Sequence, residues 1–192
     1  MIISLVGLSG SGKSFIANLL KEYNKKIIHI DIDKIGHSSH HNPTVKENLI
    51  KIFGTKIITN GEIDRKKLSE IVFTSKEAML TLEKITWSFM EKEIDNIISS
   101  NKDKIILLDW LLLPRTKFFY QSDFRILITA PFDIRMERAI SRDNITKEQF
   151  LKRESSAPII DESQFEYIIE NIELEITKER VKSIYDKSII HR

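Results

Sequence analysis

The segment that most constrains the fold of this chain runs from Gly7 to Ser14 and reads Gly-Leu-Ser-Gly-Ser-Gly-Lys-Ser. It satisfies the pattern G-x-x-x-x-G-K-[ST] in full. An apolar run, Ile2–Val6, precedes the segment, and helical periodicity over Lys13–Tyr23 follows it. This order of strand, glycine-rich turn and helix is the context in which the pattern forms a phosphate-binding loop.

Further strands and helices are expected to alternate along the chain, as they do in βαβ units. Helix ends carry recognisable caps: Asn42-Pro43 starts one helix, Asp64 another, and Thr146 opens a capping box. The pattern predicts an α/β protein with the three-layer P-loop NTPase fold and a five-stranded parallel sheet. The expected strands are 2–6, 26–30, 105–108, 125–129 and 167–169, and the expected helices are 13–23, 43–53, 64–73, 75–99, one from 147 and one from 173.

The residue types of the loop suit the binding of ATP and Mg²⁺. Glycines let backbone N–H groups converge on phosphate oxygens, and a helix N-terminus adds a favourable dipole. Lys13 can reach the β- and γ-phosphates, while the Ser14 hydroxyl can bind Mg²⁺. Asp109 ends an apolar strand and is expected to hold Mg²⁺ through water, the alternative being a solvated acid. The loop residues expected to bind ATP are Ser9, Gly10, Ser11, Gly12, Lys13 and Ser14.

Composition excludes several classes of protein. The chain has no cysteine, which excludes disulfides, thiolate zinc sites and iron–sulfur clusters. Thirty Lys and Arg against 28 Asp and Glu leave a formal charge of +2, too balanced to indicate a nucleic-acid partner. No apolar run is long enough for a membrane span. We therefore expect a cytoplasmic protein, monomeric or weakly homo-oligomeric, whose partner is a small-molecule substrate and neither nucleic acid nor membrane.

Beyond the phosphate loop, the order and spacing of later segments resemble the dephospho-coenzyme A kinase family. These segments are His29-Ile-Asp-Ile-Asp-Lys-Ile-Gly-His37, then 53–54, 60–68, 71–73, 135–143 and 167–171. The resemblance covers most of the chain. It implies a kinase that phosphorylates the ribose 3′-hydroxyl of dephospho-coenzyme A with ATP. It also implies one kinase domain over residues 1–192, with an acceptor-binding helical region at about 34–100 and a lid at about 135–156.

The acceptor side is expected around two acids that follow the second strand. The resemblance places the catalytic aspartate at Asp33, while Asp31 is an acceptor-side candidate that could instead cap a helix. Arg65 resembles the substrate-facing arginine of the family, with a solvated surface arginine as the alternative. His37 is expected to be solvated or to face the acceptor.

Arg135, Arg138 and Arg142 recur three and four residues apart and are expected to share one helix face. Arginines on a closing lid can neutralise the charge of a transferring phosphoryl group. Arg138 and Arg142 are therefore expected to bind ATP, with Arg142 the favoured catalytic arginine. The alternative is a solvated basic face.

Three departures from the family pattern concern the acceptor side. Thr86-Trp87 stands where the family has His-Pro, the run 109–113 lacks the family's proline, and Ser156 replaces a glutamine. Two other functions therefore stay open: a kinase of (deoxy)nucleoside monophosphates, and a nucleotide-binding regulatory module with weak hydrolysis. The paired acids and the arginine-bearing lid favour a transferase over the module.

Overall fold

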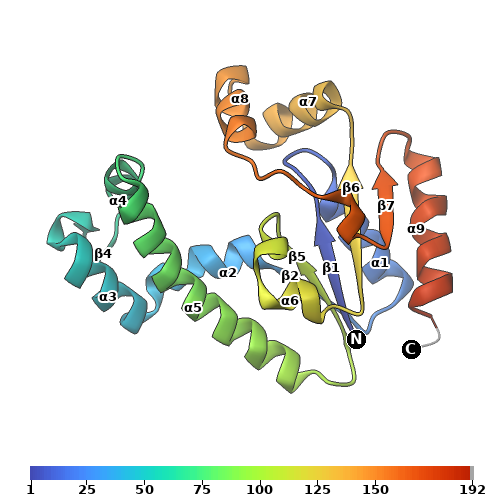
Figure 1. Cartoon of the computed structure of the whole chain (residues 1–192), viewed down its shortest axis with the longest axis horizontal. Coiled ribbons are helices and arrows are strands. Elements are labelled where there is room, and N and C mark those ends of the chain that lie inside the picture. The colour runs from blue at the N-terminus through green and yellow to red at the C-terminus, as the bar shows by residue number, and fades with distance from the viewer. Residues whose placement is uncertain (191–192) are drawn as a thin grey trace. The chain divides into compact units, whose positions relative to one another are not determined.

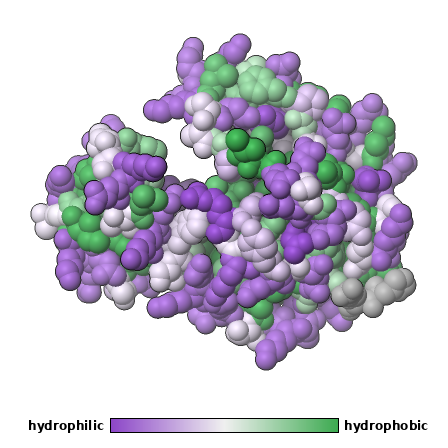
Figure 2. Space-filling model, viewed as in Figure 1, coloured by the Kyte–Doolittle hydropathy of each residue, from purple (hydrophilic) through white to green (hydrophobic). Residues whose placement is uncertain are grey.

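A computed structural model describes residues 1–190 of the chain, which form two compact units. The first unit contains Met1–Asp31 together with the chain from Asn101 onward, and the second contains Ile32–Ser100. Hydrophilic side chains cover most of the visible surface of both units (Figure 2), as expected when apolar residues form the cores. Across the described residues, no helix combines the length and the apolar character of a membrane span.

The first unit is built on a five-stranded parallel sheet with the strand order β2-β5-β1-β6-β7 (Figure 1). The predicted fold class is therefore confirmed. Because all strands are parallel, their carboxyl ends meet at one edge, where open α/β sheets bind ligands. The strands are β1 (Ile2–Val6), β2 (Ile27–Asp31), β5 (Ile105–Asp109), β6 (Phe124–Thr129) and β7 (Tyr167–Glu170).

The central strands of the sheet are apolar because both of their faces are covered. All five residues of β5 are buried, and so are four of the five residues of β1. On one face, α1 (Lys13–Tyr23) and α9 (Leu174–Ser188) pack against each other and against the sheet. Leu20 of α1 and Val181 of α9 contribute to this core. The packing fixes the start of α1, and with it the phosphate loop, at the carboxyl edge.

The remaining elements of the first unit follow β5 and β6. A 3-10 turn (Leu113–Arg115) and α6 (Lys117–Gln121) connect β5 to β6, and a 3-10 turn (Glu162–Gln164) precedes β7. Two helices, α7 (Phe132–Asp143) and α8 (Lys147–Ser155), lie on the side to which the strands point (Figure 1). The predicted capping box of α8 is present: the Thr146 hydroxyl accepts from the Gln149 N–H, and the Gln149 side chain accepts from the Thr146 N–H. We call residues 132–155 the lid helices after the lid predicted for this segment, and their closing over a ligand stays a prediction.

The second unit is mainly helical and has its own apolar core. Its helices are α2 (Ile32–Ser38), α3 (Pro43–Phe53), α4 (Arg65–Val72) and α5 (Lys76–Ser100), with 3-10 turns at Ser39–His41 and Thr55–Ile57 and a hairpin of β3 (Ile58–Thr59) and β4 (Glu62–Ile63). Asn42 caps α3 by accepting from the Val45 N–H at 3.2 Å, as its sequence predicts. Asp64 caps α4 through the N–H groups of two following lysines. The core contains Leu49, Ile57 and Leu68.

Candidate active site

The phosphate loop connects β1 to α1 and packs tightly against the neighbouring backbone. Gly10 and Gly12 have φ angles of 79° and 96°, a region that favours glycine. A Cβ atom on Gly10 would overlap the Arg135 carbonyl oxygen. The loop therefore needs glycine at position 10 both for its backbone conformation and for its contact with α7.

An acidic and two basic side chains meet at the carboxyl edge beside this loop. Asp109 at the end of β5 is buried, and its Oδ1 lies 3.8 Å from Lys13 Nζ. Its other carboxylate oxygen lies 3.1 Å from Nε2 of His29. Lys13 Nζ also donates to the Gly7 carbonyl at 2.9 Å. The lysine of the loop is thus held at the end of the sheet, next to the carboxylate that was predicted to serve the metal.

A cavity of about 570 Å³ opens over the start of α1. Its walls come from the phosphate loop, from the first turn of α1 and from α7. The lining residues are Leu8, Gly10, Gly12, Lys13, Ser14, Phe15, Glu137, Arg138, Ser141 and Arg142. Glycine backbone, a lysine and two arginines thus line one hollow, which suits a polyanionic ligand such as a chain of phosphates.

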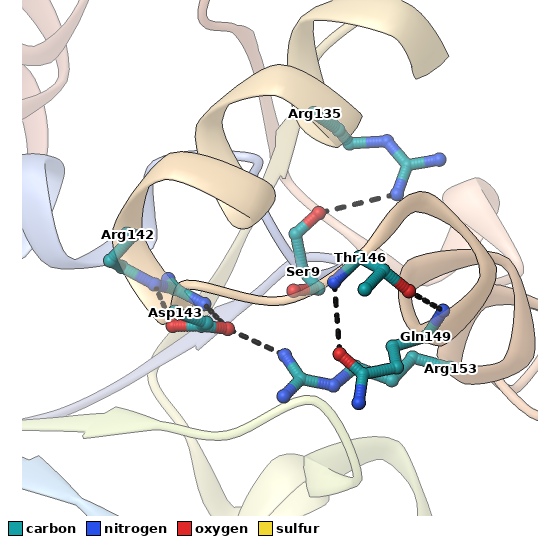
Figure 3. Close-up of polar contacts among 7 residues, drawn as sticks. All are labelled: Ser9, Arg135, Arg142, Asp143, Thr146, Gln149 and Arg153. Carbon is teal, nitrogen blue, oxygen red and sulfur yellow. Dashed lines mark hydrogen bonds and ion pairs between the residues drawn. The ribbon is translucent and has the colours of Figure 1, made fainter.

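The three arginines predicted to share one helix face have different partners. Arg135 is 6% exposed and donates to both carboxylate oxygens of Glu154, to the Ala130 carbonyl at 3.2 Å and to the Ser9 carbonyl at 3.3 Å. Figure 3 shows its guanidinium turned toward Ser9, away from Arg142. The packing of α7 against the phosphate loop and α8 therefore makes Arg135 a link between these elements. Arg138 and Arg142 line the cavity.

Arg142 belongs to a charged cluster at the end of α7 (Figure 3). Its guanidinium donates to the Asp143 carboxylate at 2.8 and 3.0 Å, and Arg153 of α8 donates to the same carboxylate at 2.5 Å. The hydrogen bond from Arg142, with that from Arg153, lowers the pKa of Asp143 to about 2. The hydrogen bond with the Asp143 carboxylate also raises the pKa of Arg142. The cluster ties α7 to α8 while the Arg142 side chain stays 60% exposed.

Asn171 follows β7 and is a buried contact of the phosphate loop, a role that the sequence analysis did not assign to it. Its amide nitrogen donates to the Ser11 carbonyl at 2.8 Å, and its backbone carbonyl accepts from Arg138 at 2.9 Å. Its sequence signals are its place at the end of the segment 167–171, which resembles the family's last strand, and its position after the fifth strand, where groups reach the carboxyl edge of the sheet.

The predicted acceptor residues are divided between the two units. Asp31 ends β2 and lies directly beside Asp109 in the sheet register, so two acids meet at the carboxyl edge. Asp33 lies in the first turn of α2, and His37 in its last turn. Arg65 is the first residue of α4. Asp33, His37 and Arg65 are not buried within the second unit, and their roles toward an acceptor stay predictions.

The positions that depart from the family pattern have ordinary structural roles. Thr86 lies within α5, where its hydroxyl donates to the Leu82 carbonyl at 2.9 Å. Trp110 is buried directly after β5. The Ser156 hydroxyl donates to carbonyls of the last turn of α8 and so satisfies that helix end.

The parallel sheet, the phosphate loop between β1 and α1, and the cavity lined by Lys13 and two arginines together define a P-loop kinase. Over residues 1–172, the chain matches the dephospho-CoA kinase family. It is 34% identical to the dephospho-CoA kinase of Aquifex aeolicus (strain VF5) over 191 residues, which cover 96% of each chain. It is 35% identical to the enzyme of that name from Fusobacterium nucleatum over 149 residues, 77% of this chain and 76% of the relative. The chain belongs to the dephospho-CoA kinase family.

Solved structures share the fold. A protein of Thermus thermophilus aligns with a TM-score of 0.83 at 24% identity, covering 98% of this chain and 97% of the other. The dephospho-CoA kinase of Campylobacter jejuni aligns with a TM-score of 0.61 at 23% identity, covering 97% and 96%. The predicted fold is thus confirmed, and the family match and the sequence relatives confirm the predicted family. Among the functions left open by the sequence, family membership supports an ATP-using dephospho-CoA kinase over a nucleoside monophosphate kinase or a regulatory module.

Proposed function

We propose that this chain transfers the γ-phosphoryl group of ATP to the ribose 3′-hydroxyl of dephospho-CoA, with Asp33 accepting or orienting the hydroxyl proton. The observation that carries the proposal is the cluster at the carboxyl edge, where Lys13, Asp109 and Asp31 meet beside the phosphate loop. Asp33 follows Asp31 by two residues, at the start of α2. An alcohol acceptor must lose a proton during transfer, and a carboxylate is suited to receive it.

Ser14 and Asp109 are the residues that would hold Mg²⁺ in this proposal. A hydroxyl and a carboxylate are hard oxygen donors of the kind that Mg²⁺ prefers. Both Asp109 oxygens already lie near Lys13 and His29, so its contact to the ion is expected to pass through water. When bound, the ion would neutralise charge on the β- and γ-phosphates.

The basic residues of the cavity would stabilise the transferring phosphoryl group. Lys13 donates to the Gly7 carbonyl at 2.9 Å and would exchange that contact for a phosphate oxygen when ATP binds. Arg138 and Arg142 would neutralise the charge that spreads over the phosphoryl oxygens in the transition state. The Gly12 N–H and other backbone N–H groups of the loop would hold the phosphates in place, whereas the Ser11 N–H donates to the Leu8 carbonyl at 3.1 Å.

The second unit would supply the acceptor contacts. Arg65 and His37 would bind anionic and polar groups of dephospho-CoA, while Asp33 acts on its 3′-hydroxyl. We further propose that the enzyme works in the cytoplasm as a monomer or weak homo-oligomer, on small molecules alone.

The proposal is tested by following ADP release with ATP and a panel of acceptors: dephospho-CoA and the nucleoside monophosphates. Dephospho-CoA should be the best acceptor. Asp33→Asn keeps the size of the side chain but removes its charge, and kcat should fall at least about a hundredfold while ATP affinity changes little. Asp103→Asn, a neutralised exposed acid outside the site, is the matched control and should retain activity. A nucleoside monophosphate as best acceptor, with Asp33→Asn affecting KM alone, would refute the proposal.

A further inference from the structure

Asn171 joins three elements of the first unit at one buried point. Its backbone N–H donates to the Thr129 carbonyl at 2.8 Å, which continues the pairing of β7 with β6. The side chain then turns to the phosphate loop, and its Oδ1 accepts from the Thr177 hydroxyl of α9 at 3.3 Å. Asn171 is 6% exposed and Thr177 is 1% exposed. The amide is therefore oriented by α9 before it meets the loop.

The contact of Asn171 with the loop fixes the direction of one peptide group. The amide nitrogen donates to the Ser11 carbonyl at 2.8 Å. In a planar trans peptide, the C=O of one residue and the N–H of the next point in opposite directions. Binding the Ser11 carbonyl therefore turns the Gly12 N–H away from Asn171. Loop N–H groups that converge on one side are what binds phosphate.

The Asn171 side chain packs so closely against Gly12 that no side chain fits at position 12. A Cβ atom on Gly12 would overlap the Asn171 amide nitrogen. The amide thus lies directly against the Gly12 α-carbon, and the glycine φ of 96° holds the peptide in place at the start of α1. A side chain of another shape or charge at position 171 would change the environment of this peptide.

The same residue also holds a cation of the cavity wall. The Asn171 backbone carbonyl accepts from Arg138 at 2.9 Å, and Arg138 lines the cavity above the loop. A hydrogen bond from a charged donor is stronger than a neutral one and has a defined direction. Asn171 therefore contacts both the loop peptide, through its side chain, and the Arg138 guanidinium, through its backbone carbonyl.

We infer that Asn171 is a positioning residue for the nucleotide phosphates, because it aligns the Ser11–Gly12 peptide and Arg138 around them. The inference rests on the proposed function in one respect, namely that nucleotide phosphates bind to this loop. It assigns to Asn171 a share of the affinity for the phosphates and none of the affinity for the nucleoside.

The test compares ADP with adenosine as probes, since the ratio of their dissociation constants isolates the contribution of the phosphates. Asn171→Asp replaces the donor with an oxygen that faces the Ser11 carbonyl, and it should weaken ADP binding about tenfold or more. Adenosine binding, measured by competition against labelled ADP, should change less than about twofold. Thr177→Val keeps Asn171 but removes the hydroxyl that orients it, so it should also raise the ratio of the ADP to the adenosine dissociation constant, by a smaller factor.

Tyr167→Phe is the matched control, because it removes a different hydrogen bond between β7 and α9, the one between the Tyr167 and Ser188 hydroxyls. A purely structural role would lower the melting temperature in all three variants and leave the ADP-to-adenosine ratio at its wild-type value. That result in both Asn171→Asp and Thr177→Val would overturn the inference. A wild-type protein that shows no preference for ADP over adenosine would overturn the proposed nucleotide site as well, so the two failures are distinct.

Discussion

Replacing Glu154 with Gln should destabilise the first unit, because it removes the negative charge from a buried guanidinium. Arg135 is 6% exposed, and Glu154 is its carboxylate partner, with Nη1 and Oε2 2.9 Å apart. Removing one partner of a fully buried pair costs about 3–5 kcal/mol. Here the substituted amide would keep one acceptor, and Arg135 would keep its bonds to the Ser9 and Ala130 carbonyls. The expected loss is therefore about 1.5–3 kcal/mol, the range for a hydrogen bond to a charged group.

This loss can be measured by thermal and urea unfolding followed by circular dichroism. For a chain of this length, about 1.5–3 kcal/mol corresponds to a fall in Tm of roughly 3–12 °C. Arg153→Gln is the matched control, because it removes one member of the ion pair with Asp143 on the same lid helices. The Arg153 side chain is 48% exposed, and pairs at such positions contribute about 0–1 kcal/mol.

Two outcomes would refute the reasoning about Arg135. One is an unfolding free energy for Glu154→Gln within about 0.5 kcal/mol of the wild type, the range for ordinary surface changes. The other is an equal loss in Arg153→Gln. A double variant, Arg135→Met with Glu154→Leu, should recover part of the lost stability, because apolar side chains of similar volume remove the desolvation cost of the buried charges.

Three further predictions concern the loop and the lid helices. Lys13→Ala should lower kcat by about a hundredfold or more with an unchanged circular dichroism spectrum, since it removes one electrostatic stabiliser; near-wild-type turnover would rule out its role. Arg142→Ala should lower kcat more than ATP affinity, and a change in affinity alone would exclude a transition-state role. The pKa of Asp143 is lowered to about 2, so its ionised form stabilises the fold above about pH 4, and this contribution is lost as the pH falls toward 2. The difference in unfolding free energy between wild type and Asp143→Asn should accordingly shrink over that interval, whereas a constant difference would contradict the assignment.

Local signals in the sequence account for the elements that were predicted well. Apolar runs mark β1 and β5, and the expected helix 13–23 matches α1 because Gly12 and Asn24 flank it. The capping box at Thr146 shows in the sequence because both of its partners lie within four residues. In each case, the side chains that define the element are neighbours along the chain.

Elements and contacts set by tertiary packing were not predicted. The helix α2 was not predicted, because it begins at Ile32, directly after β2, with no turn residue between them to mark its start. The helix α6 has only five residues, too few to show a helical period in the sequence. Its Phe118 and Phe119 are buried in the core, and this packing is visible only in the structure. The sequence spacing does not distinguish Arg135 from Arg138 and Arg142. The burial of Arg135 follows from its ion pair with Glu154 of α8, a contact between two helices. Asn171 meets Ser11 from the far end of the chain, which no local pattern encodes.

The strand order also affects how the protein can fold during synthesis. β1 precedes the other strands of the sheet in the sequence but lies at its centre, where Ile2 is paired with Ile106 of β5 and Ile3 with Phe124 of β6. Both of its neighbours are therefore synthesised in the second half of the chain. The second unit is continuous in sequence and can form while the apolar β1 segment still has no strand to pair with. Pairings of such long sequence separation form slowly. The nascent chain should thus expose both edges of β1 to chaperones until β5 has left the ribosome, and one edge until β6 has followed.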